Sequence, residues 1–227
     1  GAVTQRQYDA DGNLLKFIAY ATPVGPNAAA ASVVASIKDR ISDKVWDAAG
    51  RQIFNVDALG NVTQVIYDKN GNVTRNVAYA SAITPPTMAV NSAAAITAAL
   101  HADAVHDRVS QAAYDVANRL ELAVDATGAV VENTYDSIGH VVQVRSYSRQ
   151  IDISSLSANA SPQEIRARLN PDAVNDRITR QLFDGDGRAV FSVDALGYVT
   201  RNEYDAFGRV VRSTQYALAI PADVVQT

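Results

Sequence analysis

Residues 46–79 read WDAAGRQIFNVDALGNVTQVIYDKNGNVTRNVAY, and one short pattern occurs in them three times. In each copy an aromatic residue or Val precedes an Asp, and a Gly follows three residues after that Asp. The pairs begin at Trp46, Val56 and Tyr67, so they are 10 and then 11 residues apart. Self-similarity at a fixed spacing predicts a repeat protein built from one supersecondary unit.

The same triplet recurs along the chain. Its members begin at residues 46, 56 and 67, at 114, 124 and 135, and at 183, 193 and 204. The pair at Tyr8 corresponds to the third member of a further triplet, and another aromatic follows 12 residues after each third member. The repeat aromatics are Tyr8, Trp46, Tyr67, Tyr114, Tyr135, Phe183 and Tyr204, together with Tyr20, Tyr79, Tyr147 and Tyr216, and stacked units would place these last four in a ladder.

The fourth residue after each aromatic or Val is Gly in every copy except one, where it is Asn. Gly and Asn are the residues that best tolerate positive φ. An Asp at the start and a left-handed residue at the end are typical of a type I turn in a three-residue hairpin with a bulge, in which the Asp side chain accepts from the turn's own amides. The predicted turn positions are Gly12, Gly50, Gly60, Gly71, Asn118, Gly128, Gly139, Gly187, Gly197 and Gly208, with Asp9, Asp47, Asp57, Asp68, Asp115, Asp125, Asp136, Asp184, Asp194 and Asp205.

The residues between turns alternate as in β-strands. Phe54 and Val56 share one face of residues 51–56, and the polar Asn55 lies between them. This period of two predicts strands near residues 40–46, 51–56, 61–67 and 72–79, which would form a four-stranded antiparallel meander. The expected fold class is mainly β with short α-helical inserts, in which repeated meanders form a spiralling or superhelical sheet.

Segments rich in Ala, Ser and Pro separate the meanders. In the last of them, Ser161, Pro162 and Glu164 predict an N-cap, a proline at the first helical position and a capping-box glutamate. Asn170–Pro171 is expected to end that helix and begin a second, and the middle segment aligns with both helices. The first segment is expected to keep only the second helix, at SVVASIKDR (32–40).

These boundaries predict the domain organisation. Because GAVTQRQYDADGN (1–13) matches GYVTRNEYDAFGR (197–209), the chain is expected to be an excerpt of a longer array. We expect a partial unit with a short helical insert at 1–39, a first unit at 40–107 (meander 40–79, insert 80–107), a second at 108–176 (meander 108–147, insert 148–176) and a third at 177–227 (meander 177–216 and the start of an insert).

Composition excludes several classes of protein. The net charge is −4 and the basic residues are scattered, which argues against a nucleic-acid partner. There is no Cys, so neither disulfides nor thiolate chemistry are expected. The lack of Cys fits both a cytosolic protein and a bacterial secreted repeat protein, so the compartment stays open. No apolar run is long enough for a membrane span, and no signal peptide opens the sequence.

A family resemblance follows from the repeat. The pattern aromatic-Asp-x-x-Gly-Arg followed by a strand, as in WDAAGRQIF (46–54) and YDAFGRVVRSTQY (204–216), strongly resembles the YD or RHS repeats. They occur in bacterial polymorphic toxins, the C component of insecticidal toxin complexes, very large surface proteins and animal teneurins. The resemblance implies a spiralling sheet, often a hollow shell, that encloses a toxic polypeptide or builds a surface body.

This chain departs from the usual family pattern in two respects. Its helical inserts interrupt the meanders every 68 or 69 residues, so a ribbon or superhelix of discrete units is expected as much as a closed shell. The Asp-Pro-x-Gly-Leu motif of the family's self-cleaving domain is not in the sequence.

Catalytic and metal sites are not expected. His101 and His106 lie five residues apart, not the four that place two ligands on one helix face. Asp184 and Asp186 resemble part of a calcium loop but lack its terminal Glu, and turn formation explains them and the similar Asp9 pair. We therefore expect no enzyme activity, no catalytic residue, no cofactor and no metal. The tyrosines could stack sugars or bases, but packing between strands is the favoured interpretation.

Two functions remain open. The first is a structural repeat module of a large secreted or cell-surface bacterial protein, which builds a scaffold or shell. The second is a binding module for adhesion, which presents a carbohydrate or protein contact surface. The expected partners are neighbouring repeat units of a longer chain or assembly, with an enclosed polypeptide or a surface ligand as further candidates.

Overall fold

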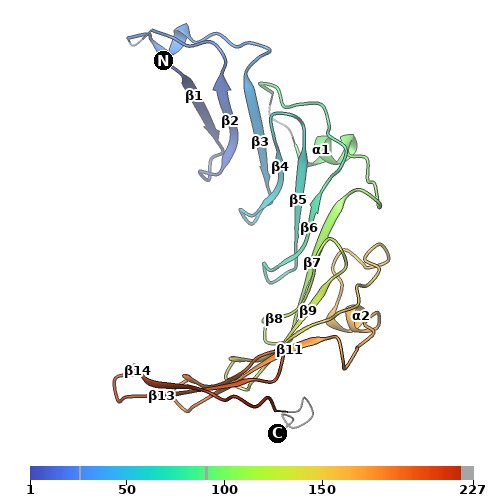
Figure 1. Cartoon of the computed structure of the whole chain (residues 1–227). Coiled ribbons are helices and arrows are strands. Elements are labelled where there is room, and N and C mark those ends of the chain that lie inside the picture. The colour runs from blue at the N-terminus through green and yellow to red at the C-terminus, as the bar shows by residue number, and fades with distance from the viewer. Residues whose placement is uncertain (26, 90–91, 221–227) are drawn as a thin grey trace. The chain divides into compact units, whose positions relative to one another are not determined.

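The computed structural model of the chain describes residues 1–25, 27–89 and 92–220. Its fourteen β-strands follow one another in sequence order in one antiparallel sheet, and β1 and β14 are its edges (Figure 1). The described strands do not close on themselves, since each edge strand has one hydrogen-bonded neighbour. The expected fold class, mainly β with meanders and short helical inserts, is confirmed.

The chain divides into two compact units, residues 1–110 and 111–227. The first contains strands β1 to β6 and two short helices, and β7 crosses the boundary. Their bounds are β1 (Val3–Tyr8), β2 (Leu14–Tyr20), the 3₁₀ helix η1 (Ala30–Ser32), β3 (Arg40–Trp46), β4 (Gln52–Val56), β5 (Val62–Tyr67), β6 (Val73–Ala78), α1 (Ala93–Ala99) and β7 (Arg108–Tyr114). The expected strands at 40–46, 51–56, 61–67 and 72–79 agree with β3 to β6 to within about a residue at each end.

The second unit repeats the arrangement twice. A meander of β7 to β10 precedes one helix, and a further meander of β11 to β14 follows it. The bounds are β8 (Leu120–Val124), β9 (Val130–Tyr135), β10 (Val141–Ser146), α2 (Pro162–Arg166), β11 (Arg177–Phe183), β12 (Ala189–Val193), β13 (Val199–Tyr204) and β14 (Val210–Gln215).

Hairpins of two kinds alternate in each meander. Where an aromatic residue precedes the turn Asp, the pairing register shifts beside that residue, as at Trp46 between β3 and β4 and at Tyr67 between β5 and β6. Where Val56 precedes it, β4 and β5 pair without a shift. The extra residue of a β-bulge re-aims a side chain, so the aromatic positions are the ones displaced from the ordinary alternation.

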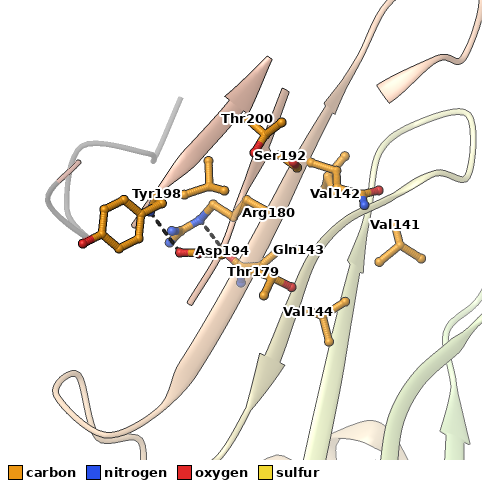
Figure 2. Close-up of a pocket in the computed structure, with 12 residues that line it drawn as sticks. Val141, Val142, Gln143, Val144, Thr179, Arg180, Ser192, Asp194, Tyr198 and Thr200 are labelled. Atoms are coloured by element: carbon orange, nitrogen blue, oxygen red, sulfur yellow. Dashed lines mark hydrogen bonds between the residues drawn. The ribbon is translucent and has the colours of Figure 1, made fainter. Parts of the chain in front are cut away.

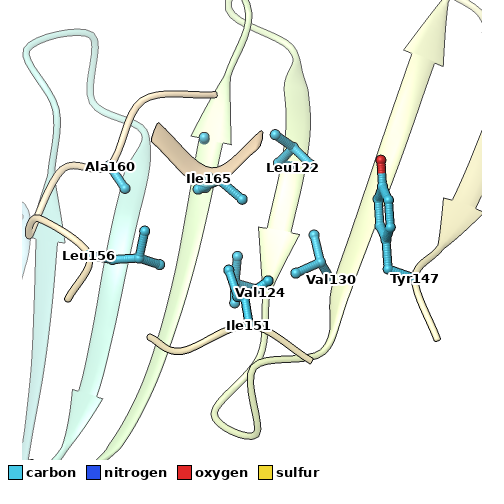
Figure 3. Close-up of a cluster of buried hydrophobic side chains, with 9 residues drawn as sticks. Leu122, Val124, Val130, Tyr147, Ile151, Leu156, Ala160 and Ile165 are labelled. Atoms are coloured by element: carbon cyan, nitrogen blue, oxygen red, sulfur yellow. The ribbon is translucent and has the colours of Figure 1, made fainter. Parts of the chain in front are cut away.

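Each of the two α-helices packs on the meander that precedes it. Ile96 of α1 contacts Phe54, Val56 and Val62, and only 1% of its surface is exposed. In the second unit, Ile165 of α2 is fully buried in a larger cluster that includes Leu122, Val124, Val130, Leu156 and Tyr147 (Figure 3). A meander is a single layer and would by itself expose its apolar face to solvent. These inserts cover that face and supply the second layer of the core.

The helix expectations are correct in part. The Ser161 hydroxyl accepts from the amide of Glu164 at 3.1 Å and Pro162 opens the helix, as expected. The Glu164 carboxylate does not close a capping box. It accepts from the backbone amide and hydroxyl of Ser157, both at 2.8 Å, and so ties the loop before the helix to its first turn.

The second helix expected in each insert is wrong. Residues 171–176 and 102–107 form single turns, closed by the bonds from Asp176 N to Asp172 O at 2.9 Å and from Asp107 N to Asp103 O at 2.8 Å. The Asp103 carboxylate accepts the amides of Val105 and His106 as an N-cap residue does, but β7 begins at Arg108, so the turn does not extend into a helix. In the first insert η1 is the only helix among the described residues.

Candidate functional site

The repeated turn is the feature in which the polar side chains concentrate. In the turn at Asp57, Oδ1 accepts from the amides of Leu59 at 2.8 Å and Asn61 at 2.9 Å, and Oδ2 accepts from the Asn61 side chain at 2.8 Å. The Gly60 amide donates to the Asp57 carbonyl at 3.0 Å and closes the turn. One carboxylate therefore satisfies donors that the tight turn removes from the strand ladder.

All ten turns share this geometry. In each, the Asp Oδ1 accepts the amides two and four residues later. The residue at the fourth position has positive φ throughout, +65° at Asn118 and +71° to +101° at the nine glycines. The side chain of Arg51 holds the pKa of Asp47 below its usual value, and that of Asn61 does the same for Asp57.

An Arg and a Tyr join the first and third turns of each complete triplet. Arg51 lies over the ring of Tyr67 at 4.6 Å and donates to the Asp47 carboxylate and to the Asp68 carbonyl. The Tyr67 hydroxyl donates to the Gln52 carbonyl at 3.0 Å. The same stacking joins Arg119 to Tyr135 at 4.3 Å and Arg188 to Tyr204 at 5.1 Å. This cation–π contact fixes two neighbouring hairpin ends to each other.

The middle turn of each triplet receives the chain that leaves the meander. The amides of Ile83, Ile151 and Ile220 each donate to the carbonyl of the middle-turn glycine at 2.9 Å. A Cβ on Gly60 would lie 2.0 Å from the Ile83 carbonyl oxygen, and one on Gly128 would lie 2.2 Å from that of Ile151. These glycines are needed both for positive φ and for the close approach of a second backbone.

A second group of aspartates closes the inserts, and sequence reasoning missed it. Asp107 accepts from the amides of Ala80 at 2.8 Å and Asp103 at 2.9 Å, so it joins the two ends of its insert. Asp176 does the same with Ser148 and Asp172, and Asp39 with Ala21 and Ser36. The sequence signal that could have revealed these aspartates is the Asp-Arg pair at the start of each meander, at Asp39, Asp107 and Asp176.

The Asp176 carboxylate illustrates the electrostatics of this closure. Burial by itself would raise its pKa, but donors from the Ser148 and Asp172 amides and the Arg145 side chain outweigh burial and hold the pKa far below its usual value. Arg145 donates to Oδ2 at 2.7 Å and also lies 4.8 Å over the Tyr147 ring. The carboxylate is engaged in hydrogen bonds with these structural partners, and its lowered pKa makes it unsuited to acid–base chemistry near neutral pH.

Within each unit, the described tyrosines that end the meanders make no stacked ring pair with one another. The only stacked ring pair in the described part of the chain is His140 with Phe183, at 4.4 Å. The hydroxyls of Tyr20 and Tyr79 donate to the side chains of Gln5 in β1 and Gln64 in β5. Burial, and then the hydrogen bond to Glu132, raise the pKa of Tyr147 to about 12.

Among the residues that the structure describes, the ion pair of Lys16 and Asp43 is fully buried. The Lys16 Nζ donates to the Asp43 carboxylate and to the Thr87 carbonyl, the latter at 2.8 Å. Lys16 has no exposed surface and Asp43 has 2%. Because Thr87 belongs to the 80–107 insert, this pair binds that insert to β2 and β3.

Figure 2 shows a shallow groove of about 520 Å³ on strands β10 to β13. Val144, Thr179 and Ser192 line it, and Arg180 Nε donates to Oε1 of Gln143 at 3.1 Å beside them. The lining combines aliphatic and hydroxyl side chains with the polar side chains of Arg180, Asp194 and Tyr198.

The candidate metal and catalytic residues lie apart or are engaged. Within residues 1–25, 27–89 and 92–220 no group of three His, Asp or Glu residues could hold a metal ion. Asp184 and Asp186 both pair with Arg188, at 2.8 and 2.9 Å. The imidazoles of His106 and His140 contact Asp103 at 2.7 Å and Asp136 at 2.9 Å. That the chain binds no metal and is not an enzyme stays a prediction.

Comparisons with known proteins gave matches among solved structures alone. No family model matches, and no curated protein matches. A structure of the Photorhabdus luminescens Tc holotoxin pore is 18% identical with a TM-score of 0.45, and covers 97% of this chain and 10% of that chain. The TcdB2–TccC3 complex without its hypervariable C-terminal region is 17% identical with a TM-score of 0.45, over 97% of this chain and 11% of that one. A TcdB2–TccC3–Cdc42 structure is 16% identical with a TM-score of 0.44, over 95% of this chain and 10% of that one.

These are loose likenesses at low identity, and this chain spans about a tenth of the length of the chains that it matches. None of the helices in the described residues is both long and apolar enough to cross a membrane.

Proposed function

We propose that the chain is a structural repeat module of a large secreted or cell-surface bacterial protein of the YD or RHS type, in which its meanders build a β-sheet scaffold or shell. The observation that carries the proposal is the use of the carboxylates. The Asp of every turn accepts two backbone amides, and those of Asp39, Asp107 and Asp176 close the inserts. Carboxylates are common catalytic groups in enzymes, but these ones accept hydrogen bonds from backbone amides of the turns and inserts.

The sheet edges support neighbouring repeat units as the partners. β1 and β14 each present one side without a strand among the described residues, and such edges pair readily with further strands. The resemblance to YD and RHS repeats adds an enclosed polypeptide or a surface ligand as further partners.

An in-phase deletion tests the modular architecture. Removal of residues 80–147 joins Tyr79 to Ser148, whose preceding residue, Tyr147, occupies the same position in its meander as Tyr79. In a repeat protein each unit contacts mainly its neighbours, so the shortened chain should remain soluble and rich in β-structure with a lower midpoint.

The structure also specifies a repair for this variant. Arg75 occupies the position of Gln143, which accepts from Arg180. The deletion would therefore place Arg75 opposite Arg180, and adding Arg75→Gln should raise the midpoint of the shortened chain. An out-of-phase deletion of residues 60–92 is the control and should unfold or aggregate. Collapse of the in-phase variant even with Arg75→Gln would contradict a modular scaffold.

The groove on β10 to β13 favours adhesion as the second candidate function. Its hydroxyl and aliphatic lining is suited to a carbohydrate or an extended peptide. A glycan array and a cell-binding assay separate the two functions, because specific retention that is lost on Thr179→Trp would favour the binding module.

A further inference from the structure

One apolar surface of the third meander lies open, although its counterparts in the two earlier meanders are covered. Phe191, Val199, Tyr216, Leu218 and Ile220 line a groove of about 540 Å³ at this surface. The lining is mainly apolar: 42% of Tyr216 and 84% of Leu218 are exposed. A groove of this kind, rimmed by polar strand residues, is typical of an interaction site.

The corresponding positions elsewhere in the chain are closed. Phe191 occupies the position of Phe54 and Leu122, and those two residues are 3% and 0% exposed. Val199 likewise corresponds to Val62 and Val130, each 1% exposed. The strands, the register and the entering Ile amide are the same in all three meanders, so among residues 1–25, 27–89 and 92–220 the third meander differs in having no helix over this surface.

Both existing covers have one design. In α1 the Ser92 hydroxyl caps the helix by accepting from Ala95 N at 3.1 Å, and Ile96 follows four residues after the Ser. In α2 the Ser161 cap and Ile165 have the same spacing. Both isoleucines are buried, at 1% and 0% exposed, so a short Ser-capped helix with Ile at its fourth position fits this surface.

The charge beside the groove indicates which residue should follow the Ile in a helix that binds there. Glu132 pairs with Leu122 across the strands and accepts from Arg166, which follows Ile165, at 2.6 Å. In the third meander the residue that pairs with Phe191 is Arg201. Its guanidinium lies 6.0 Å over the Phe191 ring and pairs with the Glu203 carboxylate at 3.4 Å, and its side chain is 47% exposed. The sign of the charge is reversed, so the occupant should carry a carboxylate where α2 carries Arg.

We propose that this groove is the docking site for a Ser-capped helical turn with Ile at its fourth position and Asp or Glu at its fifth. The inference rests on the proposed scaffold function and deepens it, because it states the chemistry of the segment that completes the third unit. Burial of the Ile supplies the binding energy, and the ion pair with Arg201 supplies the selectivity.

The full chain can test this in cis. Residues 221–227 are replaced by a copy of residues 152–169, so that the copy follows Ile220 as the original follows Ile151. One graft keeps the copied Arg166 and a second has Glu there, and each is made with Arg201 and with Arg201→Glu. In the control graft, Asp replaces the copied Ile165. The measurements are the thermal midpoint and hydrogen exchange of β12 and β13 amides.

The Glu graft should raise the midpoint by about 4 °C or more over the control graft and slow exchange in β12 and β13, while β8 is unchanged. On the parent chain, the midpoint of the Glu graft should also be higher than that of the Arg graft. With Arg201→Glu, the Arg graft should instead have the higher midpoint. Equal midpoints for the Glu and control grafts would overturn the docking site, and an order that ignores residue 201 would overturn the charge selectivity. Neither result would change the outcome expected for the in-phase deletion of residues 80–147. Failure of the docking site and failure of the scaffold function can therefore be told apart.

Discussion

The middle-turn glycines give the sharpest test of the architecture. Gly60 and Gly71 lie in one unit and have nearly equal φ, +87° and +90°. They differ in what a Cβ would meet: the Ile83 carbonyl oxygen at 2.0 Å for Gly60, and nothing closer than the Arg51 guanidinium at 4.0 Å for Gly71. The pair Gly60→Ala and Gly71→Ala therefore separates the cost of left-handed backbone from the cost of losing the insert's attachment.

The expected costs differ in size. Both variants incur the strain of Ala in the left-handed region, about 1–2 kcal/mol. Gly60→Ala must also displace Ile83, which breaks the hydrogen bond from its amide to the Gly60 carbonyl and costs about 1 kcal/mol. Ile83 packs against the core around Ile96, and loss of part of that burial adds up to about 1.5 kcal/mol. We expect totals of about 1–2 kcal/mol for Gly71→Ala and about 2–4.5 kcal/mol for Gly60→Ala.

Urea unfolding followed by circular dichroism measures both free energies on one chain. Gly60→Ala should also speed hydrogen exchange at Ile83, whereas Gly71→Ala should leave that amide protected. Equal destabilisation by the two substitutions would refute the reasoning, because it would mean that the close backbone approach at Gly60 has no energetic consequence.

Further predictions concern the polar residues. Asn118→Gly should be neutral or mildly stabilising in urea unfolding, since φ is +65° there, and a loss above about 1 kcal/mol would contradict the turn geometry. Lys16→Met should cost about 3–5 kcal/mol in the same assay because the Asp43 carboxylate stays buried and loses its Lys16 counter-ion, and the double variant with Asp43→Leu should recover most of that loss. The pKa of Asp176 is lowered in the folded chain, so this carboxylate stabilises the fold above its unfolded pKa near 4, and the stabilisation is lost as the pH falls further. Asp176→Asn should therefore flatten the decline of the thermal midpoint below pH 4. An unchanged slope would contradict a stabilising role for the Asp176 carboxylate. EDTA should leave the midpoint unchanged and no hydrolase or transferase activity should be found, whereas a clear drop in the midpoint would show a metal in the Asp-rich turns.

The local part of the fold could be predicted from the sequence because its determinants lie within a few residues of one another. An Asp that accepts the amides two and four residues later, and a Gly or Asn that takes positive φ, specify a turn without reference to the rest of the chain. Period-two alternation then placed β3 to β6 to within about a residue. The expected helix at 171–176 was wrong, because β11 begins at Arg177 and leaves room for only the single turn that Asp172 caps.

The tertiary structure decided what joins distant residues. Nothing in the local sequence shows that Asp107 meets Ala80, that Lys16 reaches Thr87, or that the carbonyl of Ile83 occupies the space beside Gly60. These contacts exist because the strands pair in sequence order and each insert returns over its own meander. Turn chemistry acts over about four residues and was readable from the spacing alone, whereas the covering of each meander, and the open groove at Phe191, depend on which surfaces the completed sheet brings within van der Waals distance.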